Sequence, residues 1–219
     1  MGPPGSGKGS LSQMCIQHLG WAQLSTGALL RKHIAEKTEI GRQIDFAIKS
    51  GILVSDDLIV KMVEEWLVNH TNNVNAIILD GFPRTLVQAE ALYELFKTSL
   101  RNYSLRIIRL HVSNEAVIKR LSCRATCQNM ECQAVYSMIV NSSQAPKSDM
   151  ICDLCGSPLV RRSDDKEESV TERLRSYYAH EKSVIEFFKN NHIAVDELYV
   201  EKPLHIVFDE FKKVIDVVV

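Results

Sequence analysis

The amino-acid sequence predicts an α/β fold in which a parallel sheet carries helices on both of its faces. Short apolar runs, rich in β-branched residues and typical of buried parallel strands, alternate with helical patterns along the chain. A glycine-rich turn leads straight into the first helix, and a cysteine-rich segment at 123–161 interrupts the alternation as an insertion. With 219 residues, the chain is long enough to bury one full α/β core with elaborations.

Each element follows from a local pattern, taken in chain order. Helices are predicted at 8–19, 27–36, 39–50, from 56 onward after an N-cap cluster at 55–57, 85–100, 114–121, 163–190, and from 203 to the end. Strands are predicted at 76–79, 105–112 and 193–200. Arg162 and Arg173 are eleven residues apart, about three helical turns, so the long helix that starts near 163 is expected to carry both on one face.

The composition argues against several classes of function. The net charge is −1, the isoelectric point is about 6.7, and like charges form no long block. Nothing therefore favours a nucleic acid or a membrane surface as the main partner. No stretch approaches the roughly 18 consecutive apolar residues of a membrane span, and the sequence contains no signal-peptide core and no internal repeat.

The glycine-rich turn at 2–8 fits G-x-x-x-x-G-K, whose backbone N–H groups wrap phosphate oxygens in P-loop NTPases. The helix after it points its N-terminus at the bound anion. Ser10 offers a hydroxyl for Mg²⁺ one place later than in the commonest form of the motif. Asp80 ends an apolar strand, where a second magnesium-linked carboxylate belongs in such enzymes; an ordinary Asp-Gly turn is the alternative.

The start of the numbering raises a separate expectation. A phosphate-binding turn belongs at the carboxyl end of a buried strand, yet only Met1 precedes Gly2. We expect that the numbering starts at an internal methionine of a longer protein, and that the first strand of the sheet is missing from it. This form should be poorly stable and nearly inactive, and about six β-branched apolar residues before Met1 should restore both properties.

Five segments together resemble the adenylate kinase family in its long-lid form: GPPGSGKGS, LSTGALLR, GILVSDDL, LDGFPRTLVQAEAL and RRSDDKEESVTERL. They occur in the order and at the spacings of that family, and the resemblance covers nearly the whole chain. The pattern is also similar to the branch that includes the mitochondrial GTP:AMP phosphotransferases. The resemblance implies reversible, magnesium-dependent phosphoryl transfer from ATP or GTP to AMP.

The resemblance also implies an organisation. The P-loop core would comprise 1–24, 55–122 and 162–219, with a small helical monophosphate-binding domain at 25–54 and a zinc-ribbon-like lid at 123–161. The protein is expected to be a monomer inside the cell, in the cytoplasm or the mitochondrial matrix.

For the donor nucleotide, the resemblance implies contacts from the glycine turn, from the lid and from the last loop. The implied residues are Gly5, Ser6, Gly7, Lys8, Gly9, Ser10, Arg120, Arg124, Val135, Tyr136 and Lys202. Lys8 would bridge the transferred group and the donor β-phosphate, and Arg120 would flank the donor base. Which base is bound, adenine or guanine, stays open.

For AMP, the implied residues are Thr26, Gly27, Arg31, Leu53, Val54, Gly81, Arg84, Gln88, Arg162 and Arg173. Arginine suits these phosphate contacts because its guanidinium binds phosphate oxygens in a bidentate manner. Gln88 carries a donor and an acceptor, so it can pair with an adenine edge. This chain has Ala28 at a position where most members of the family have Asp. The resemblance therefore leaves open the fine adjustment of the acceptor loop, but it still implies the same mode of AMP binding.

The catalytic group implied by the resemblance is Lys8, Arg84, Arg124, Arg162, Arg173, Asp164 and Asp165. The two acids would hold the closed lid or order water on Mg²⁺. As plain caps of the long helix, they would need no catalytic role.

The cysteine-rich insertion suggests a structural zinc. Cys127 and Cys132 form a C-x4-C pair, and Cys152 and Cys155 form a C-x-x-C pair, a donor set that suits tetrahedral Zn²⁺. Cys123 is close enough in sequence to compete as a ligand. A disulfide is the weaker reading for an intracellular enzyme, and Cys15 is expected to be a buried thiol.

Two other functions stay open. The cysteine segment could be a zinc ribbon that binds a partner, on a P-loop fold that no longer turns over, although the full set of arginines argues against this. A kinase of UMP or CMP is the alternative within enzymes, and Thr26 and Gln88 favour AMP.

Overall fold

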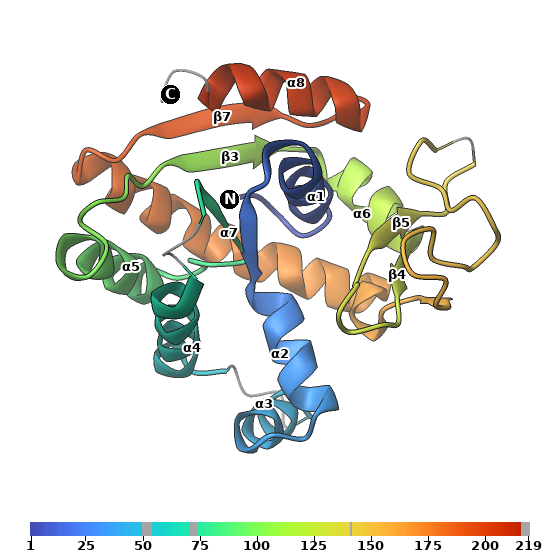
Figure 1. Ribbon diagram of the computed structural model, residues 1–219, viewed down its shortest axis with the longest axis horizontal. Coiled ribbons are helices and arrows are strands. Elements are labelled where there is room, and N and C mark those ends of the chain that lie inside the picture. The colour runs from blue at the N-terminus through green and yellow to red at the C-terminus, as the bar shows by residue number, and fades with distance from the viewer. Residues whose placement is uncertain (50–53, 71–73, 141, 216–219) are drawn as a thin grey trace. The chain divides into compact units, whose positions relative to one another are not determined.

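A computed structural model describes residues 1–49, 54–70, 74–140 and 142–215 (Figure 1). The helices are α1 (Lys8–Leu19), α2 (Thr26–Ala35), α3 (Glu39–Lys49), α4 (Asp56–His70), α5 (Leu86–Thr98), α6 (Asn114–Ser122), α7 (Glu167–Asn190) and α8 (Leu204–Ile215). The strands are β1 (Ala22–Ser25), β2 (Ile77–Asp80), β3 (Ile107–His111), β4 (Arg124–Cys127), β5 (Val135–Ser137), β6 (Leu159–Val160) and β7 (Val195–Tyr199). The predicted α/β class is confirmed, and the predicted elements lie close to the observed ones.

Helix starts follow from capping side chains. Ser25 precedes α2, and its hydroxyl accepts a hydrogen bond from the Ala28 backbone N–H at 3.4 Å. Thr85 precedes α5, and its Oγ1 accepts from the Gln88 N–H at 3.2 Å. In each case one of the unpaired amides of the first turn is satisfied. Capping therefore fixes where the two helices next to the candidate acceptor residues begin.

The core strands form two pairs. β1 is parallel to β2, in a register that runs from Ala22 opposite Ile77 to Ser25 opposite Asp80. β3 pairs with β7, and their flanking bonds, from the Ile107 N–H to the Ala194 carbonyl and from the Val200 N–H to the His111 carbonyl, show that they run the same way. Both pairs are parallel, as predicted.

Within the part of the chain that the structure describes, the predicted parallel strands are divided between two sheets. The β1–β2 and β3–β7 pairs are separate two-stranded sheets. A ladder requires a neighbouring strand about 4.8 Å away, and no described strand pairs with both β2 and β3. The amino group of Met1 donates to the Ile108 carbonyl at the edge of β3.

The start of the long helix also differs from the prediction. Residues Ser163–Asp165 form a turn of 3-10 helix, Lys166 is extended (φ −68°, ψ 146°), and α7 begins only at Glu167. Arg162 lies before this turn with extended backbone (φ −74°, ψ 142°). Arg162 and Arg173 therefore do not share a face of one helix, because the backbone leaves helical geometry between them.

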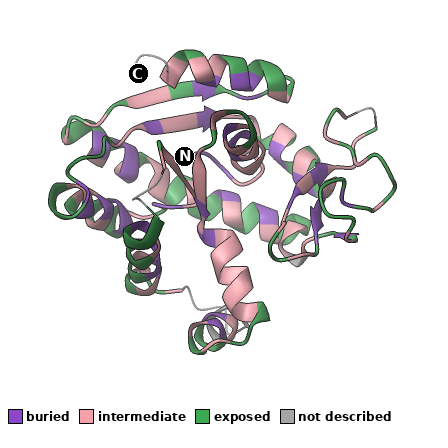
Figure 2. Cartoon of the chain, viewed as in Figure 1, coloured by how far each residue is buried: buried purple, intermediate pink, exposed green. Residues whose placement is uncertain are grey.

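The chain divides into two compact units. Unit 1 contains Met1, Ser12–Ile108 and His180–Asp196, and unit 2 contains Gly2–Leu11, Arg109–Ala179 and the part from Glu197 onward. Unit 1 has a large apolar core, in which residues of α4 and α5 pack with residues of β1 and α7; Figure 2 shows the buried residues along α5. The three-part organisation expected from the family resemblance cuts the chain at other places and stays a prediction.

Within unit 2, the segment at 123–161 forms a small antiparallel sheet. β4 lies between β5 and β6, with Ala125 opposite Tyr136 and Cys127 opposite Leu159. Its buried cluster contains six residues: Ala125, Cys127, Ala134, Tyr136, Cys152 and Leu159. So small a core contributes little stabilisation by apolar burial. A bound structural metal would therefore add substantially to the stability of this segment.

No helix within the described ranges is both long enough and apolar enough to cross a membrane. The predicted AMP contact at Leu53, like the predicted helix end at Ser50, lies outside the described residues.

Candidate active site

The glycine-rich turn of unit 2 has the backbone of a phosphate cradle. Gly5 and Gly7 have φ angles of +74° and +93°, in the left-handed region that favours glycine. A Cβ at Gly5 would lie 2.9 Å from the Leu121 side chain, so the turn packs closely on α6. The turn leads into α1, whose first residues are Lys8, Gly9 and Ser10, and the positive end of that helix favours an anion at this place.

The Lys8 amine lies across this turn. Its Nζ donates to the carbonyl of Gly2 at 2.8 Å, to the carbonyl of Pro3 at 2.9 Å and to the Ser6 hydroxyl at 3.2 Å. Ser6 is buried at 1% exposure, which keeps its hydroxyl in place. The ammonium charge is thus held at the mouth of the turn, where a phosphate oxygen can replace a carbonyl as its partner.

Arg120 ties the turn to the end of β7. Its Nη2 donates to the Val200 carbonyl at 2.6 Å, and its Nη1 lies 3.5 Å from the Ser6 carbonyl. Burial lowers the pKa of this guanidinium from its usual value. Lys202, in the loop that follows, pairs with Glu210 at 2.6 Å on the surface. Two residues predicted to bind the donor therefore lie at the chain segment that follows β7: Lys202 belongs to it, and Arg120 donates a hydrogen bond to it.

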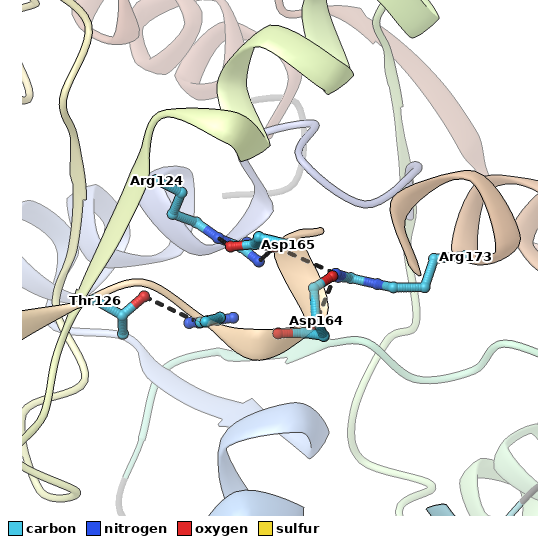
Figure 3. A network of polar contacts seen from close by, with 6 residues as sticks. Arg124, Thr126, Asp164, Asp165 and Arg173 are labelled. Atoms are coloured by element: carbon cyan, nitrogen blue, oxygen red, sulfur yellow. Dashed lines mark hydrogen bonds and ion pairs between the residues drawn. The ribbon is translucent and has the colours of Figure 1, made fainter. Parts of the chain in front are cut away.

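Four charged residues of unit 2 form an arginine–aspartate cluster, which we define as Arg124, Asp164, Asp165 and Arg173 (Figure 3). Arg124 binds Asp165 with two bonds, Nε–Oδ2 at 2.8 Å and Nη2–Oδ1 at 2.5 Å. Arg173 Nη1 lies 3.0 Å from Asp164 Oδ2 and 3.4 Å from Asp165 Oδ1. One carboxylate thus holds two of the predicted phosphate-binding arginines.

Burial makes the Asp165 contacts the stronger ones in this cluster. The Asp165 side chain is 6% exposed and that of Arg124 is 14% exposed, whereas that of Asp164 is 47% exposed. Water screens the exposed contact much more than the buried one. Nearby, Arg162 Nε donates to the hydroxyl of buried Thr126 at 2.9 Å.

In unit 1, a second group of predicted residues comes together, which we call the acceptor corner: Thr26, Gly81, Arg84 and Gln88. Thr26 Oγ1 donates to the Asp80 carbonyl at 3.3 Å, and Arg84 Nε donates to the Gly81 carbonyl at 2.8 Å. Gly81 has φ +86°, and a Cβ there would lie 2.7 Å from Thr26 Oγ1 and 3.0 Å from Arg84 Nη2. Only glycine allows this close approach.

Gln88 is the most buried polar side chain of the corner together with Thr26, each at 4% exposure. Its Oε1 accepts from the Arg84 backbone N–H at 2.8 Å, and its Nε2 donates to Asp56 Oδ1 at 2.7 Å. Thr85 Oγ1 donates to the other oxygen of Asp56 at 2.8 Å. Sequence reasoning identified Asp56 only as part of a helix cap, because nothing local shows that it faces α5.

Three more of the residues predicted to bind AMP, Gly27, Arg31 and Val54, also belong to unit 1, whereas Arg162 and Arg173 belong to unit 2. Gly27 is in the first turn of α2, where a Cβ would lie 3.3 Å from Arg31 Nη1, so the Arg31 guanidinium folds over that turn. Val54 is half-buried against the unit 1 core. Asp80 ends β2, and its Oδ2 lies 3.4 Å from Gln23 Nε2. Its predicted link to magnesium stays a prediction.

The four predicted zinc ligands are brought together in the segment at 123–161, the predicted lid. The sulfur atoms of Cys127, Cys132, Cys152 and Cys155 all lie within 4.8 Å of one another. The Cys127–Cys155 and Cys132–Cys152 sulfurs are 3.4 Å and 3.7 Å apart, too far for disulfides. Four sulfurs at about 2.3 Å from a tetrahedral zinc lie roughly 3.8 Å from each other, so the donor set fits zinc.

The protonation of these thiols differs from one to the next. Hydrogen bonds from the Ser157 side chain and backbone lower the pKa of Cys155 to about 6, whereas burial raises the pKa of Cys127 to about 12. Cys15, far from this cluster in sequence, is fully buried, and burial raises its pKa to about 12, as expected of an inert core thiol.

Two further lid residues were predicted to bind the donor. Tyr136 is buried, and its hydroxyl lies 3.4 Å from Cys152 Sγ and accepts from the Asp153 N–H at 2.8 Å. Its side chain therefore supports the cysteine cluster, and only its backbone is left for a nucleotide contact. Val135 precedes it in β5 and is half-buried.

Comparison with known proteins identifies the family. The family model described as adenylate kinase matches residues 1–193. The adenylate kinase of Archaeoglobus fulgidus is 40% identical over 196 residues, which is 90% of this chain and 87% of the relative. Those of Thermosipho africanus and Finegoldia magna are each 39% identical, over 87% and 86% of this chain and 86% and 84% of the relatives. Over that span, and with the phosphate cradle and acceptor corner in place, the chain belongs to the adenylate kinase family.

Proposed function

We propose that this protein is a nucleoside monophosphate kinase that transfers the γ-phosphoryl group of ATP or GTP reversibly to AMP. The observation that carries the proposal is the acceptor corner. The Arg84 guanidinium and the Thr26 hydroxyl meet at a glycine that admits no side chain, and the Gln88 amide is bonded to the Arg84 backbone. The names of the similar proteins, all adenylate kinases, favour AMP as the acceptor.

In the proposed reaction, an oxygen of the AMP phosphate attacks the γ-phosphorus. The bond between the γ-phosphorus and the β–γ bridging oxygen breaks, and the donor leaves as the diphosphate. The chemistry needs little acid–base catalysis, because the charge is spread over phosphoryl oxygens throughout. The protein contributes positive groups in fixed positions, which we assign to Lys8, Arg84, Arg124, Arg162 and Arg173.

Lys8 would neutralise the phosphoryl group that moves. Its amine is already directed by three oxygens of its own turn, so a phosphate oxygen can take the place of one of them without reorganising the loop. A Mg²⁺ ion bound with the nucleotide would supply positive charge against the donor phosphates. The Ser10 hydroxyl and the Asp80 carboxylate are the residues proposed to hold it.

Arg124 and Arg173 would contribute after an exchange of partners. Both now bind Asp165, and a phosphate offers more negative charge than one carboxylate. We propose that nucleotide binding draws the two guanidinium groups from Asp165 onto phosphate oxygens, Arg124 toward the donor and Arg173 toward AMP.

The zinc proposed at Cys127, Cys132, Cys152 and Cys155 has a structural role. When bound, it would cross-link the two halves of the small lid sheet. All four protein ligands are cysteine sulfurs, so the site offers no open position for catalysis.

A test of this function uses the 219-residue chain with Mg²⁺ and a panel of donors and acceptors. Purified protein is incubated with ATP or GTP and with AMP, UMP or CMP, and ³¹P NMR follows the formation of diphosphates. We expect AMP to be the best acceptor, and Lys8→Met to abolish transfer. Turnover of UMP or CMP in preference to AMP would refute AMP as the substrate. Donor hydrolysis without transfer would refute a kinase.

A further inference from the structure

The side chain of Asp56 makes a hydrogen bond that has a direction. Asp56 lies in the first turn of α4, and its Oδ1 accepts from Gln88 Nε2 at 2.7 Å. A carboxylate can only accept, so the end of the Gln88 amide that faces it must be the NH₂ group.

A second contact fixes the other end of the same amide. The Arg84 backbone N–H can only donate, and it lies 2.8 Å from Gln88 Oε1. An amide that met only hydroxyls or water could be flipped by 180° at no cost. Between a pure acceptor and a pure donor, the Gln88 amide has only one satisfied orientation.

The carboxylate is itself held in place. Asp56 Oδ2 accepts from Thr85 Oγ1 at 2.8 Å, and Thr85 Oγ1 accepts from the Gln88 N–H at 3.2 Å. Asp56, Thr85 and Gln88 thus close a ring of hydrogen bonds that joins α4 to the first turn of α5. Gln88 is 4% exposed, so water competes little with these bonds.

The fixed amide presents one donor and one acceptor, in a defined order, to a ligand. Nε2 has a second N–H, and Oε1 has a second lone pair. Side by side, they complement a base edge that offers an acceptor next to a donor, as in 6-aminopurine, where N1 accepts and N6 donates. A 6-oxopurine presents the reverse order, with N1–H as donor and O6 as acceptor.

We propose that Asp56 is a positioning residue that sets acceptor-base specificity: by orienting the Gln88 amide, it selects a 6-aminopurine monophosphate over its 6-oxo counterpart. The inference rests on the proposed function in one respect, that Gln88 faces the acceptor base. It assigns to Asp56 a role in the choice of base, beyond its place in a helix cap.

The test measures binding, so that it does not depend on turnover. Isothermal titration calorimetry would give the Kd of AMP and of IMP, the 6-oxo analogue, for the wild-type chain and three variants. Asp56→Ala should reduce the preference for AMP over IMP about tenfold, the effect of one hydrogen bond. Asp56→Asn keeps an acceptor oxygen without the charge, and should recover most of the preference.

Asp57→Ala is the matched control. Asp57 is the next residue in the same helical turn and is exposed, so its removal costs the same helix-terminal charge without touching Gln88. Its AMP-to-IMP ratio should stay within about twofold of the wild type. If Asp56→Ala does not fold, Asp56→Ser takes its place, since the serine hydroxyl is too short to reach Gln88.

The outcomes separate this inference from the proposed function. An equal loss of AMP and IMP binding in Asp56→Ala would show a merely structural role and overturn the inference, as would a wild-type chain that binds both equally. A wild-type chain that prefers AMP but does not phosphorylate it would refute the proposed function alone. Phosphorylation of AMP without any preference in binding would refute the inference alone.

Discussion

The acceptor corner and the lid hold their polar side chains by different means. The corner sits on the apolar core of unit 1, and its groups are locked by hydrogen bonds between neutral partners and one carboxylate, Asp56. Among the described residues of the segment at 123–161, the predicted lid, the buried cluster contains six residues, two of them cysteines. The arginine–aspartate cluster, to which this segment contributes Arg124, is held by ion pairs.

The difference teaches which property each region can control. Directional hydrogen bonds distinguish one donor–acceptor pattern from its reverse, so the corner suits the recognition of a base. Ion pairs are less directional and can exchange one charged partner for another, so the arginine–aspartate cluster is compatible with the phosphate binding that we propose for it. Changes in the lid should therefore affect stability and rate, and changes in the corner should affect affinity and specificity.

The largest effect should come from metal removal, because the predicted lid has only a small apolar core to stabilise it. The acceptor corner packs on a larger core and should not depend on a metal cross-link. We expect about one zinc per chain by elemental analysis. Chelation should unfold the lid and lower its melting temperature, while the far-ultraviolet circular dichroism of the helical remainder persists. Protein that is purified without metal, with four reactive thiols and unchanged melting, would rule out the site.

The next largest effect concerns rate. Arg173→Ala should lower kcat about 10³-fold, because a positive group that stabilises phosphoryl charge is lost. Steady-state kinetics would measure it. Arg175→Ala is the control, two residues along α7, where the side chain is 82% exposed and pairs with Glu172. A kcat that falls equally in both variants would point to damage to α7 instead.

Asp165→Asn tests whether charge stabilises the cluster. It should lower the free energy of unfolding by about 3 kcal/mol, because two guanidinium groups lose a buried counter-charge. The neighbouring Asp164→Asn should cost less than about 1 kcal/mol, since the Asp164 side chain is 47% exposed. Urea denaturation of the two variants gives the comparison, and equal losses would contradict the role assigned to burial.

Arg84→Ala should act on the acceptor. We expect a fall of about 10²-fold in kcat/KM for AMP, through a raised KM and a lowered kcat, with the donor KM much less affected. Arg84 is exposed and adjoins Gly81, so the fold should tolerate its loss. A KM for AMP equal to that of the wild type would remove Arg84 from the acceptor site.

The smallest effect tests the close approach at Gly81. Gly81→Ala should cost about 2 kcal/mol of stability, from the left-handed backbone and from the crowding of Thr26 and Arg84. Gly156→Ala shares the positive φ, at +73°, but has no atom within 4 Å of the added Cβ. It should cost about 1 kcal/mol, so the difference between the two variants isolates the crowding.

The sequence by itself determined the local elements and the chemistry-bearing residues. The N-cap cluster at 55–57, the glycines of the turn at 2–8 and the two cysteine pairs are local signals, and the structure bears out the helix that starts at Asp56 and the cysteine cluster. β1 was missed because its sequence, AQLS, has no β-branched residue to mark a buried strand.

Only the tertiary structure decided which partners those residues take. That Asp56 faces Gln88, that Asp165 binds two arginines, and that Tyr136 turns toward Cys152 all join residues that are distant in sequence. The predicted common face for Arg162 and Arg173 failed because the backbone becomes extended at Lys166. Local sequence patterns determine the backbone conformation over a few residues. A hydrogen bond between two distant elements depends instead on how the whole core packs those elements together, and the periodicity of a sequence does not specify that packing.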